Sequence, residues 1–322
     1  MLYPFIFHPI LKERVWGGRN LQRLYRKPLP PAVPVGESWE VSDRPGNVSV
    51  IENGPLAGKD LRWLMENHAG DLLGCAKSLT GRFPLLIKIL DAQQKLSLQV
   101  HPPAAQAKAL GGESKTEMWY VAEAAPGAEL YVGLKRHVTR QEFEAKIQSG
   151  KVAECFHRLN VRRGDAVFLP SGRVHAIGAG LVIFEVQQNS DTTYRVFDWN
   201  RVGLDGKPRE LHVPQSLTSI NFNYFEPSLV ESAFVATGPA RVRLLVTDDS
   251  FKVEVQEAGA DSSVALRPGH LQLILFLTGQ ARLESETGSV PLTAGLTCLV
   301  PACLAQTRLL AQTPITFLRV EA

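Results

Sequence analysis

Two stretches of the chain place metal-binding side chains at the ends of predicted β-strands. In the first stretch, Gln99 and His101 stand two residues apart, and the pair Pro102-Pro103 follows at once. Side chains two residues apart leave the same face of a β-strand, and proline ends the strand because it lacks an N–H donor. Glu117 then opens the next apolar strand, after an alanine-rich connector. This stretch therefore predicts three metal donors near one end of a sheet: an amide, an imidazole and a carboxylate.

The second stretch supplies a further histidine. A strand that follows Gly164 ends in a turn that contains Pro170 and Gly172, and His175 comes directly after this turn. A single histidine in an apolar strand is more often a packed core residue than a ligand, but here three other donors accompany it: Gln99, His101 and Glu117. We therefore expect the four side chains to converge inside a small β-barrel. Two imidazoles, a carboxylate and an amide oxygen suit zinc, and they also suit iron, nickel, cobalt or manganese.

The two stretches resemble the two sequence motifs of the cupin superfamily. A cupin pattern of Gly, five residues, Pro, one residue, Gly, two residues and His is met by Gly164, Pro170, Gly172 and His175. The first stretch is similar to the other cupin motif, with Gln99 at the position of a first histidine and a long insertion before the glutamate. This combination resembles the type I mannose-6-phosphate isomerases, the zinc-dependent phosphomannose isomerases, and in particular their short form. The resemblance is close over about residues 5–230 and covers the remainder in outline.

The resemblance implies an isomerase that interconverts mannose 6-phosphate and fructose 6-phosphate by metal-assisted proton transfer through an enediol intermediate. It also implies one zinc ion per chain, held by Gln99, His101, Glu117 and His175. Two other functions remain open, because the same His/Glu/His set would serve an iron-dependent cupin oxygenase or a non-catalytic cupin that binds a sugar phosphate. Gln99 and the cationic segment 195–201 favour the isomerase.

The phosphate group of such a substrate needs cations, and the planar guanidinium of arginine offers it paired hydrogen bonds. Arg195 is our first candidate for this role, with Arg201 and Lys115 next. Ser190-Asp191 followed by Arg195 resembles the family's Ser-Asp pair and strand arginine. The resemblance therefore makes Asp191 and Arg195 candidate catalytic residues.

Lys115 carries over from the family's long-form members, in which the segment before the glutamate ligand reads Asn-His-Lys-Pro-Glu. Here residues 113–117 read Glu-Ser-Lys-Thr-Glu, so the lysine and the ligand are kept and the histidine is not. Lys115 is therefore a candidate for catalysis as well as for substrate binding. The missing histidine puts in doubt any scheme in which that residue opens the sugar ring.

Three further residues have a structural interpretation beside a functional one. Trp16 fits a surface loop with a packing tryptophan, whereas the resemblance places it beside the sugar as a substrate-binding residue. Lys88 lies in an apolar strand, where its amine either reaches solvent at the strand end or binds an anionic substrate. Glu185 lies in the apolar middle of another strand, and a buried carboxylate needs a partner. It either pairs with a neighbouring lysine or arginine for structure or serves as a catalytic carboxylate.

The order of strands and turns predicts a mainly β chain made of two cupin-type jelly-roll β-barrels with short helical insertions. Gly295 and Pro301 repeat the glycine-proline spacing that precedes His175, but no histidine follows at the corresponding place. This difference indicates that the C-terminal barrel is degenerate. We expect a catalytic metal-binding cupin domain at residues 1–235 and a degenerate cupin-like β domain without metal ligands at residues 236–322.

Short helices are predicted at three places. Apolar spacing predicts one at residues 60–68, ended by Gly70, and high helix propensity predicts another at residues 104–110. A capping-box pattern at Thr139 predicts the third, which ends at Gly150.

Charge and cysteine content narrow the choice of partner and compartment. The chain carries 35 Lys plus Arg and 32 Asp plus Glu, a formal net charge of +3, which is too small to indicate nucleic acid or a membrane as the partner. The four cysteines form no Cys-x-x-Cys pair, and the first residues lack the pattern of a signal peptide. We expect a cytoplasmic protein that acts on a small sugar phosphate, as a monomer or a weak homodimer.

Overall fold

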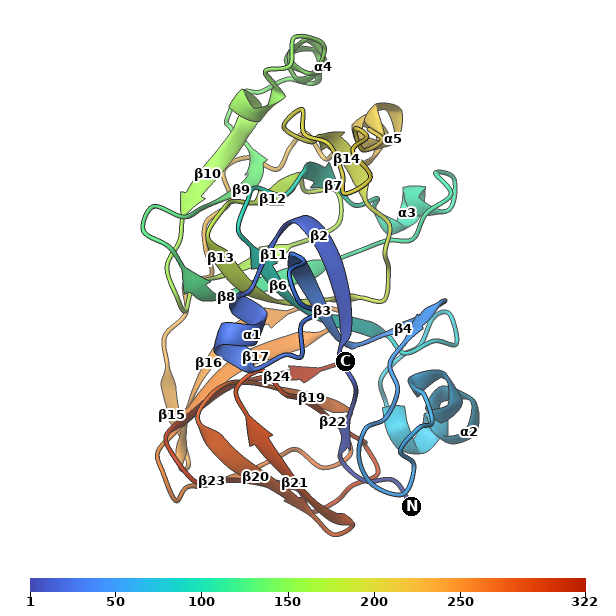
Figure 1. Cartoon of the computed structure of the whole chain (residues 1–322), viewed down its shortest axis with the longest axis vertical. Helices are drawn as coiled ribbons and strands as arrows, with labels where there is room; N and C mark the ends of the chain where they lie inside the picture. Colours follow the sequence, from blue (N-terminus) through green and yellow to red (C-terminus); the bar gives the residue numbers. More distant parts are fainter.

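Four antiparallel β-sheets contain most of the regular secondary structure in the computed structural model, which describes residues 1–322 (Figure 1). Two of these sheets face each other in the first two thirds of the chain, and two others face each other in the last third. The mainly β fold predicted from the sequence is confirmed. No helix in the structure is both long and apolar enough to cross a membrane.

The N-terminal sheet pair consists of a six-stranded and a five-stranded sheet. The six-stranded sheet has the order β11-β8-β13-β6-β3-β2 and contains β2 (Ile10–Gly18), β3 (Val35–Val41), β6 (Leu85–Ala92), β8 (Glu117–Ala124), β11 (Ala166–Leu169) and β13 (Leu181–Gln188). The five-stranded sheet has the order β10-β9-β12-β7-β14 and contains β7 (Leu98–Val100), β9 (Glu129–Leu134), β10 (Phe156–Asn160), β12 (His175–Ile177) and β14 (Tyr194–Phe197). Side chains from both sheets fill the space between them and form one of the four hydrophobic clusters.

The C-terminal sheet pair consists of a seven-stranded and a four-stranded sheet. The seven-stranded sheet has the order β1-β22-β19-β24-β17-β16-β15 and contains β1 (Phe5–Ile6), β15 (Val235–Thr237), β16 (Ala240–Thr247), β17 (Lys252–Ala258), β19 (Gln272–Thr278), β22 (Thr297–Val300) and β24 (Ile315–Glu321). The four-stranded sheet has the order β18-β23-β20-β21 and contains β18 (Ser263–Ala265), β20 (Gln280–Ser285), β21 (Gly288–Thr293) and β23 (Arg308–Ala311). The strand β1 comes from the start of the chain, so the first residues join the C-terminal sheet pair. The predicted domain boundary at residue 235 stays a prediction.

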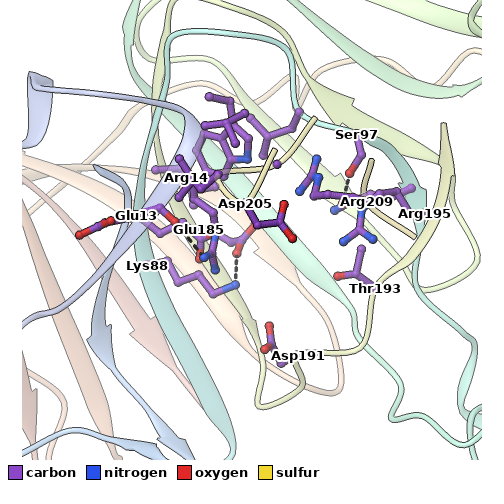
Figure 2. Close-up of a pocket in the computed structure, with 18 of the residues that line it drawn as sticks. Glu13, Arg14, Lys88, Ser97, Glu185, Asp191, Thr193, Arg195, Asp205 and Arg209 are labelled. Atoms are coloured by element: carbon purple, nitrogen blue, oxygen red, sulfur yellow. Dashed lines mark hydrogen bonds and ion pairs between the residues drawn. The ribbon is translucent and has the colours of Figure 1, made fainter. Parts of the chain in front are cut away.

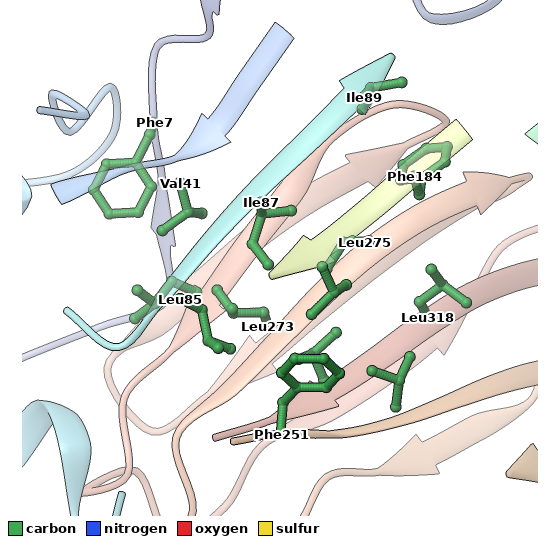
Figure 3. Close-up of a cluster of buried hydrophobic side chains, with 14 of the residues drawn as sticks. Phe7, Val41, Leu85, Ile87, Ile89, Phe184, Phe251, Leu273, Leu275 and Leu318 are labelled. Carbon is green, nitrogen blue, oxygen red and sulfur yellow. The ribbon is translucent and has the colours of Figure 1, made fainter. Parts of the chain in front are cut away.

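The six-stranded and seven-stranded sheets pack against each other through one shared hydrophobic cluster (Figure 3). Phe184 of β13 points into this cluster, whereas its neighbour Ile183 points into the interior of the N-terminal sheet pair. In β19, Leu275 enters the shared cluster and Phe276 enters the interior of the C-terminal pair. Both sheets are therefore buried on both faces, which explains why their strands read as continuous apolar runs.

Short helices and a small hairpin complete the chain. They are α1 (Asn20–Tyr25), β4 (Asp43–Arg44), β5 (Asn47–Val48), α2 (Leu61–Leu73), α3 (Ala104–Ala107), α4 (Arg140–Gln148), the 3-10 helix η1 (Val152–Cys155) and α5 (Val213–Ser219). The helix α4 begins as predicted, because the Thr139 hydroxyl accepts a hydrogen bond from the Glu142 N–H at 3.1 Å. Its Phe143 packs against Phe156 on the outer face of the five-stranded sheet.

The extents of two predicted helices were wrong. The helix predicted at residues 60–68 does not stop at Gly70, because α2 continues to Leu73 across a non-helical His68. Leu72 and Leu73 are buried in the shared cluster, and this tertiary packing holds the last turn in place. The helix predicted at residues 104–110 is only one turn, α3.

Candidate active site

Three buried side chains meet between the two N-terminal sheets. His101 directly follows β7, His175 opens β12 and Glu117 opens β8. Their candidate ligand atoms all lie within 4.8 Å of one another, and each residue is at most 1% exposed. Gln99 of β7 stands directly opposite His175 in the strand pairing. The structure therefore brings together the four side chains that the sequence predicts as a metal site.

Backbone carbonyls fix which nitrogen of each histidine faces the centre of this group. His101 Nδ1 lies 2.7 Å from the Thr192 carbonyl oxygen, and His175 Nδ1 lies 2.9 Å from that of Arg173. A carbonyl oxygen only accepts hydrogen bonds, so both Nδ1 atoms carry the proton and both Nε2 atoms present a lone pair. Second partners of this kind orient histidine ligands in metal sites.

The inward-facing atoms have few hydrogen-bond partners. His101 Nε2 and both carboxylate oxygens of Glu117 are buried without a hydrogen bond in good geometry, although Lys115 forms an ion pair with Glu117 Oε2. The Glu117 oxygens lie 3.1 Å from His175 Nε2 and 3.5 Å from His101 Nε2. Buried polar atoms without partners are costly, and a cation between them would satisfy all of them. The donor set of two imidazoles and a carboxylate therefore fits a divalent transition metal.

The protonation states suit such a cation. Burial lowers the pKa of His175 to about 3 and lowers the pKa of His101 as well, so both rings are neutral near pH 7. Burial opposes ionisation of Glu117, but Lys115 and the two imidazoles hold its pKa well below the ordinary value. Lys115 Nζ lies 2.7 Å from Glu117 Oε2. Burial lowers the pKa of Lys115, but the negative charges of Glu117 and Glu185 outweigh this effect and raise it. The site thus offers lone pairs and a carboxylate without prior loss of protons.

Gln99 approaches the same group through its amide. Its Nε2 lies 3.2 Å from His175 Nε2, and Ser97 Oγ lies 3.4 Å from its Oε1. The amide thus contacts the candidate ligand His175 directly. Rotation of the Gln99 amide by 180° exchanges its oxygen and its nitrogen, so either atom can face His175.

A pocket of about 590 Å³ lies beside the metal group, and Gln99 and Lys115 belong to its lining (Figure 2). Most of the other catalytic and substrate-binding residues predicted from the sequence also line it: Trp16, Lys88, Glu185, Asp191 and Arg195. The surface loop expected for Trp16 was wrong, because Trp16 lies in β2, is 3% exposed and packs in the interior cluster while it also borders the pocket. The predicted residues are therefore neighbours in space, whereas their individual roles stay predictions.

Two ion pairs occupy the side of the pocket formed by the six-stranded sheet. Lys88 Nζ lies 3.1 Å from Glu185 Oε1, and the indole N–H of Trp119 donates to Glu185 Oε2 at 2.8 Å. Arg14 Nε donates to Glu37 Oε1 at 2.7 Å. Lys88 therefore does not reach out to solvent, and Glu185 has the lysine partner that its structural interpretation requires.

Arg195 is the one lysine or arginine of the pocket lining that has no carboxylate partner. Its Nη1 donates to the Glu210 carbonyl oxygen at 2.8 Å, and its buried Nε has no partner. Burial lowers the pKa of Arg195, and the positive charge of Arg209 lowers it further. A guanidinium in these surroundings is prepared to receive an anion.

Arg201 does not line the pocket. Its Nη2 lies 2.7 Å from Asp198 Oδ1, and its Nη1 donates to the Lys95 carbonyl oxygen at 2.5 Å. The structure thus separates Arg201 from the other predicted substrate-binding residues.

Sequence reasoning missed other charged residues of the lining, namely Glu13, Arg14, Glu37, Asp205 and Arg209. The first three lie on β2 and β3, and the run of charged residues Lys12-Glu13-Arg14 in β2 does not show which of these side chains faces inward. The last two lie in an irregular segment after β14, for which the sequence offers no comparable pattern.

The chain is similar to known mannose-6-phosphate isomerases. A family model for the catalytic domain of type I phosphomannose isomerase matches residues 5–126. Mannose-6-phosphate isomerase ManA of Bacillus subtilis (strain 168) is 36% identical over 314 residues, which cover 95% of each chain. The crystal structure of the mannose 6-phosphate isomerase from Bacillus subtilis matches with a TM-score of 0.89 at 28% identity and covers 100% of both chains.

A structure of mannose 6-phosphate isomerase bound with zinc and yttrium shares the fold, with a TM-score of 0.76 at 18% identity, over 99% of both chains. At this identity the similarity shows the fold alone. The family model and the Bacillus relative also show the family, because the relative is similar over almost its whole length. They show that this chain belongs to the type I mannose-6-phosphate isomerase family.

Proposed function

We propose that the chain interconverts mannose 6-phosphate and fructose 6-phosphate with one divalent metal ion, for which zinc is the first choice. The observation that carries the proposal is the buried group of His101, Glu117 and His175, with unsatisfied inward-facing atoms, beside a polar pocket. Family membership favours this reaction over the iron-dependent oxygenase that the same ligands would permit.

Four residues would hold the metal: His101 and His175 through Nε2, Glu117 through its carboxylate and Gln99 through its amide oxygen. Zinc is supported by this nitrogen and oxygen donor set and by the zinc-bound isomerase of the same fold. When bound, such an ion polarises the carbonyl and hydroxyl oxygens of a sugar and stabilises the negative charge that develops on them.

Arg195 would receive the phosphate. It is the pocket cation without a carboxylate partner, and it keeps free N–H donors. A planar guanidinium binds phosphate through two parallel hydrogen bonds, which fixes the orientation of the sugar as well as its affinity.

Asp191 is the best candidate for the proton transfer between the two sugar carbons. It lines the pocket and has no ion-pair partner, whereas Glu185 is engaged by Lys88 and Trp119. Asp191 would take the proton from C2 of the aldose and return it to C1, which gives the ketose through an enediol. Lys115, kept protonated by Glu117, would donate a hydrogen bond to the oxygen on which charge develops.

A coupled assay for fructose 6-phosphate formation tests the proposal on zinc-loaded, chelated and zinc-reloaded protein. We expect turnover in the loaded form, its loss after chelation and its recovery with zinc. Binding of mannose 6-phosphate to fully loaded protein without any turnover would instead identify a non-catalytic binding module. Oxygen consumption by the iron-loaded protein in the absence of isomerisation would identify an oxygenase.

A further inference from the structure

One carboxylate holds two arginines beside the candidate phosphate end of the pocket. Asp198 Oδ1 accepts hydrogen bonds from Arg201 Nη2 at 2.7 Å and from Arg209 Nη2 at 2.6 Å. Asp198 Oδ2 accepts a further bond from Arg209 Nε at 2.6 Å. Burial raises the pKa of Asp198, but the two guanidinium groups outweigh this effect and lower it, so the carboxylate is ionised near pH 7.

The two arginines use their remaining donors differently. Arg201 Nη1 is bound by the Lys95 carbonyl oxygen, and Arg201 lies outside the pocket lining. Arg209 Nη1 has no partner, and Arg209 lines the pocket together with Arg195, Ser97 and Thr193 (Figure 2). Of the pair that Asp198 holds, Arg209 is therefore the one with a free donor at the pocket.

The backbone turn after Asp198 is held in an unfavourable conformation. Trp199 and Asn200 both have positive φ, at 57° and 55°, which costs a bulky residue such as tryptophan roughly 1 kcal/mol or more. The Trp199 indole N–H donates to the Leu96 carbonyl oxygen at 2.7 Å, and its ring packs against Phe197 and Tyr131. Strain of this kind persists where the surrounding structure fixes it, and it is common beside functional sites.

The local charge matches a phosphate monoester. Three guanidinium groups and one buried carboxylate leave a net charge of about +2, against roughly −1.5 to −2 on a phosphate group at pH 7. The nearby carboxylates Asp191, Asp205 and Glu210 are exposed to solvent, so water screens their charge. The hydroxyl groups of Ser97 and Thr193 add neutral hydrogen-bonding groups at the same end.

We propose that Arg209, positioned by Asp198, is a second phosphate-binding residue that acts together with Arg195. The proposal rests on the proposed function, because it assigns the phosphate end of the same pocket. Arg209 replaces Arg201 in this role, because Arg201 donates its hydrogen bonds to Asp198 and to the Lys95 carbonyl oxygen. Two guanidinium groups that converge on one anion select a dianionic phosphate over an uncharged sugar terminus.

Calorimetric titration of the zinc-loaded protein with inorganic phosphate tests this proposal without requiring turnover. Arg209→Ala should weaken phosphate binding by about tenfold to a hundredfold, the range for loss of hydrogen bonds to a charged group. Arg209→Lys should recover part of the affinity, because a point charge lacks the planar fork. Arg308→Ala removes an exposed arginine that pairs with Glu284 in the C-terminal sheet pair, and it should stay within twofold of wild type.

Kinetics on the same variants separate binding from structure. Arg209→Ala should raise the KM for mannose 6-phosphate by a similar factor and change kcat less, because the phosphate is bound in both the ground state and the transition state. Arg209→Gln keeps a donor for Asp198, and it provides the comparison if the alanine variant is poorly folded. Unchanged phosphate affinity in Arg209→Ala and Arg209→Gln would overturn the proposal. A larger loss of phosphate affinity in Arg201→Ala than in Arg209→Ala would overturn it as well. Wild-type protein that binds phosphate through Arg209 but turns over no sugar phosphate would overturn the proposed function alone.

Discussion

Glu37 is a buried carboxylate that the surrounding groups keep ionised. The guanidinium of Arg14 donates to one of its oxygens at 2.7 Å, and the indole N–H of Trp39 donates to the other at 2.6 Å. Burial opposes ionisation, but Lys88 and Arg14, together with the two hydrogen bonds, lower the pKa of Glu37 from 4.5 to about 2. The carboxylate therefore fixes Arg14 at the pocket wall and orients the buried indole of Trp39.

This shift predicts how stability depends on pH. A carboxyl group with a lower pKa in the folded state stabilises the protein above its unfolded pKa, and this contribution is lost as the pH falls from about 4.5 to about 2. The full contribution is roughly 3 kcal/mol. Glu37→Gln should flatten the pH dependence of the unfolding free energy in this window, measured by urea denaturation at several pH values. An identical slope in the variant and in wild type would contradict the assignment.

The two histidines of the metal group permit a direct test at the same scale. We expect His101→Ala and His175→Ala to lose most of the bound metal, because each removes a buried nitrogen that points to the shared centre. Elemental analysis after dialysis measures the loss. His8→Ala changes an exposed histidine near Glu52 and should keep the metal. Full metal content in both site variants would exclude these residues as ligands.

The sequence was sufficient to predict that the candidate metal ligands meet but not to predict the whole pocket, for a physical reason. The prolines and glycines beside His101 and His175 belong to two recognisable sequence motifs, so the motifs mark these residues, although the long-range pairing of β7 with β12 brings them together. Arg14 and Arg209 reach the pocket only through long-range pairing and through the turn after Asp198, which no local pattern encodes. Arg201 was expected in the pocket because it carries the same charge, whereas the hydrogen bonds that hold it outside are tertiary.

At the scale of elements, a row of side chains crosses four strands of the six-stranded sheet. The strand pairing places Trp119 of β8 opposite Glu185 of β13, Glu185 opposite Lys88 of β6, and Lys88 opposite Trp39 of β3. Lys88 Nζ lies 5.1 Å from the centre of the Trp39 ring, within the range of a cation–π interaction. The register thus gives each charged side chain of the row a partner on both sides.

This pairing predicts a non-additive effect on stability. Lys88→Met leaves the Glu185 carboxylate buried without its cation and should lower the unfolding free energy by about 3–5 kcal/mol. The double variant Lys88→Met with Glu185→Gln removes both charges and should be more stable than Lys88→Met alone. Urea denaturation of the single and double variants measures the coupling. Strictly additive losses would show that the two residues do not depend on each other.

Local signals explain which helices were predicted well. The helix α4 begins where the capping box predicts, because the cap involves residues three positions apart. The helix α2 passes the predicted stop at Gly70 because Leu72 and Leu73 are held in a core built by distant strands. Tertiary packing therefore overrides a local stop signal at this place.

At the scale of the whole molecule, the two sheet pairs share one hydrophobic cluster of 37 residues. It includes Phe184 and Ile87 from the N-terminal pair and Leu275 and Leu318 from the C-terminal pair (Figure 3). The strand β1 further links the start of the chain to the C-terminal sheet. Separation of the two halves would expose this apolar surface to water, so we expect them to unfold together.

The positions of the tryptophans make this expectation measurable. All five precede the predicted boundary at residue 235: Trp16, Trp39, Trp63, Trp119 and Trp199. Leu309 lies in β23 of the C-terminal pair, is 0% exposed and belongs to the interior cluster of that pair.

Leu309→Ala should lower the unfolding free energy by about 2–5 kcal/mol, because it leaves a cavity in a packed core. If the halves unfold together, tryptophan fluorescence should report the same loss as far-UV circular dichroism. Leu244→Ala, at a position 45% exposed, should change the unfolding free energy obtained from either signal by less than about 0.5 kcal/mol. A fluorescence transition that stays at the wild-type urea concentration in Leu309→Ala, while circular dichroism shows an earlier one, would show that the two halves are thermodynamically independent.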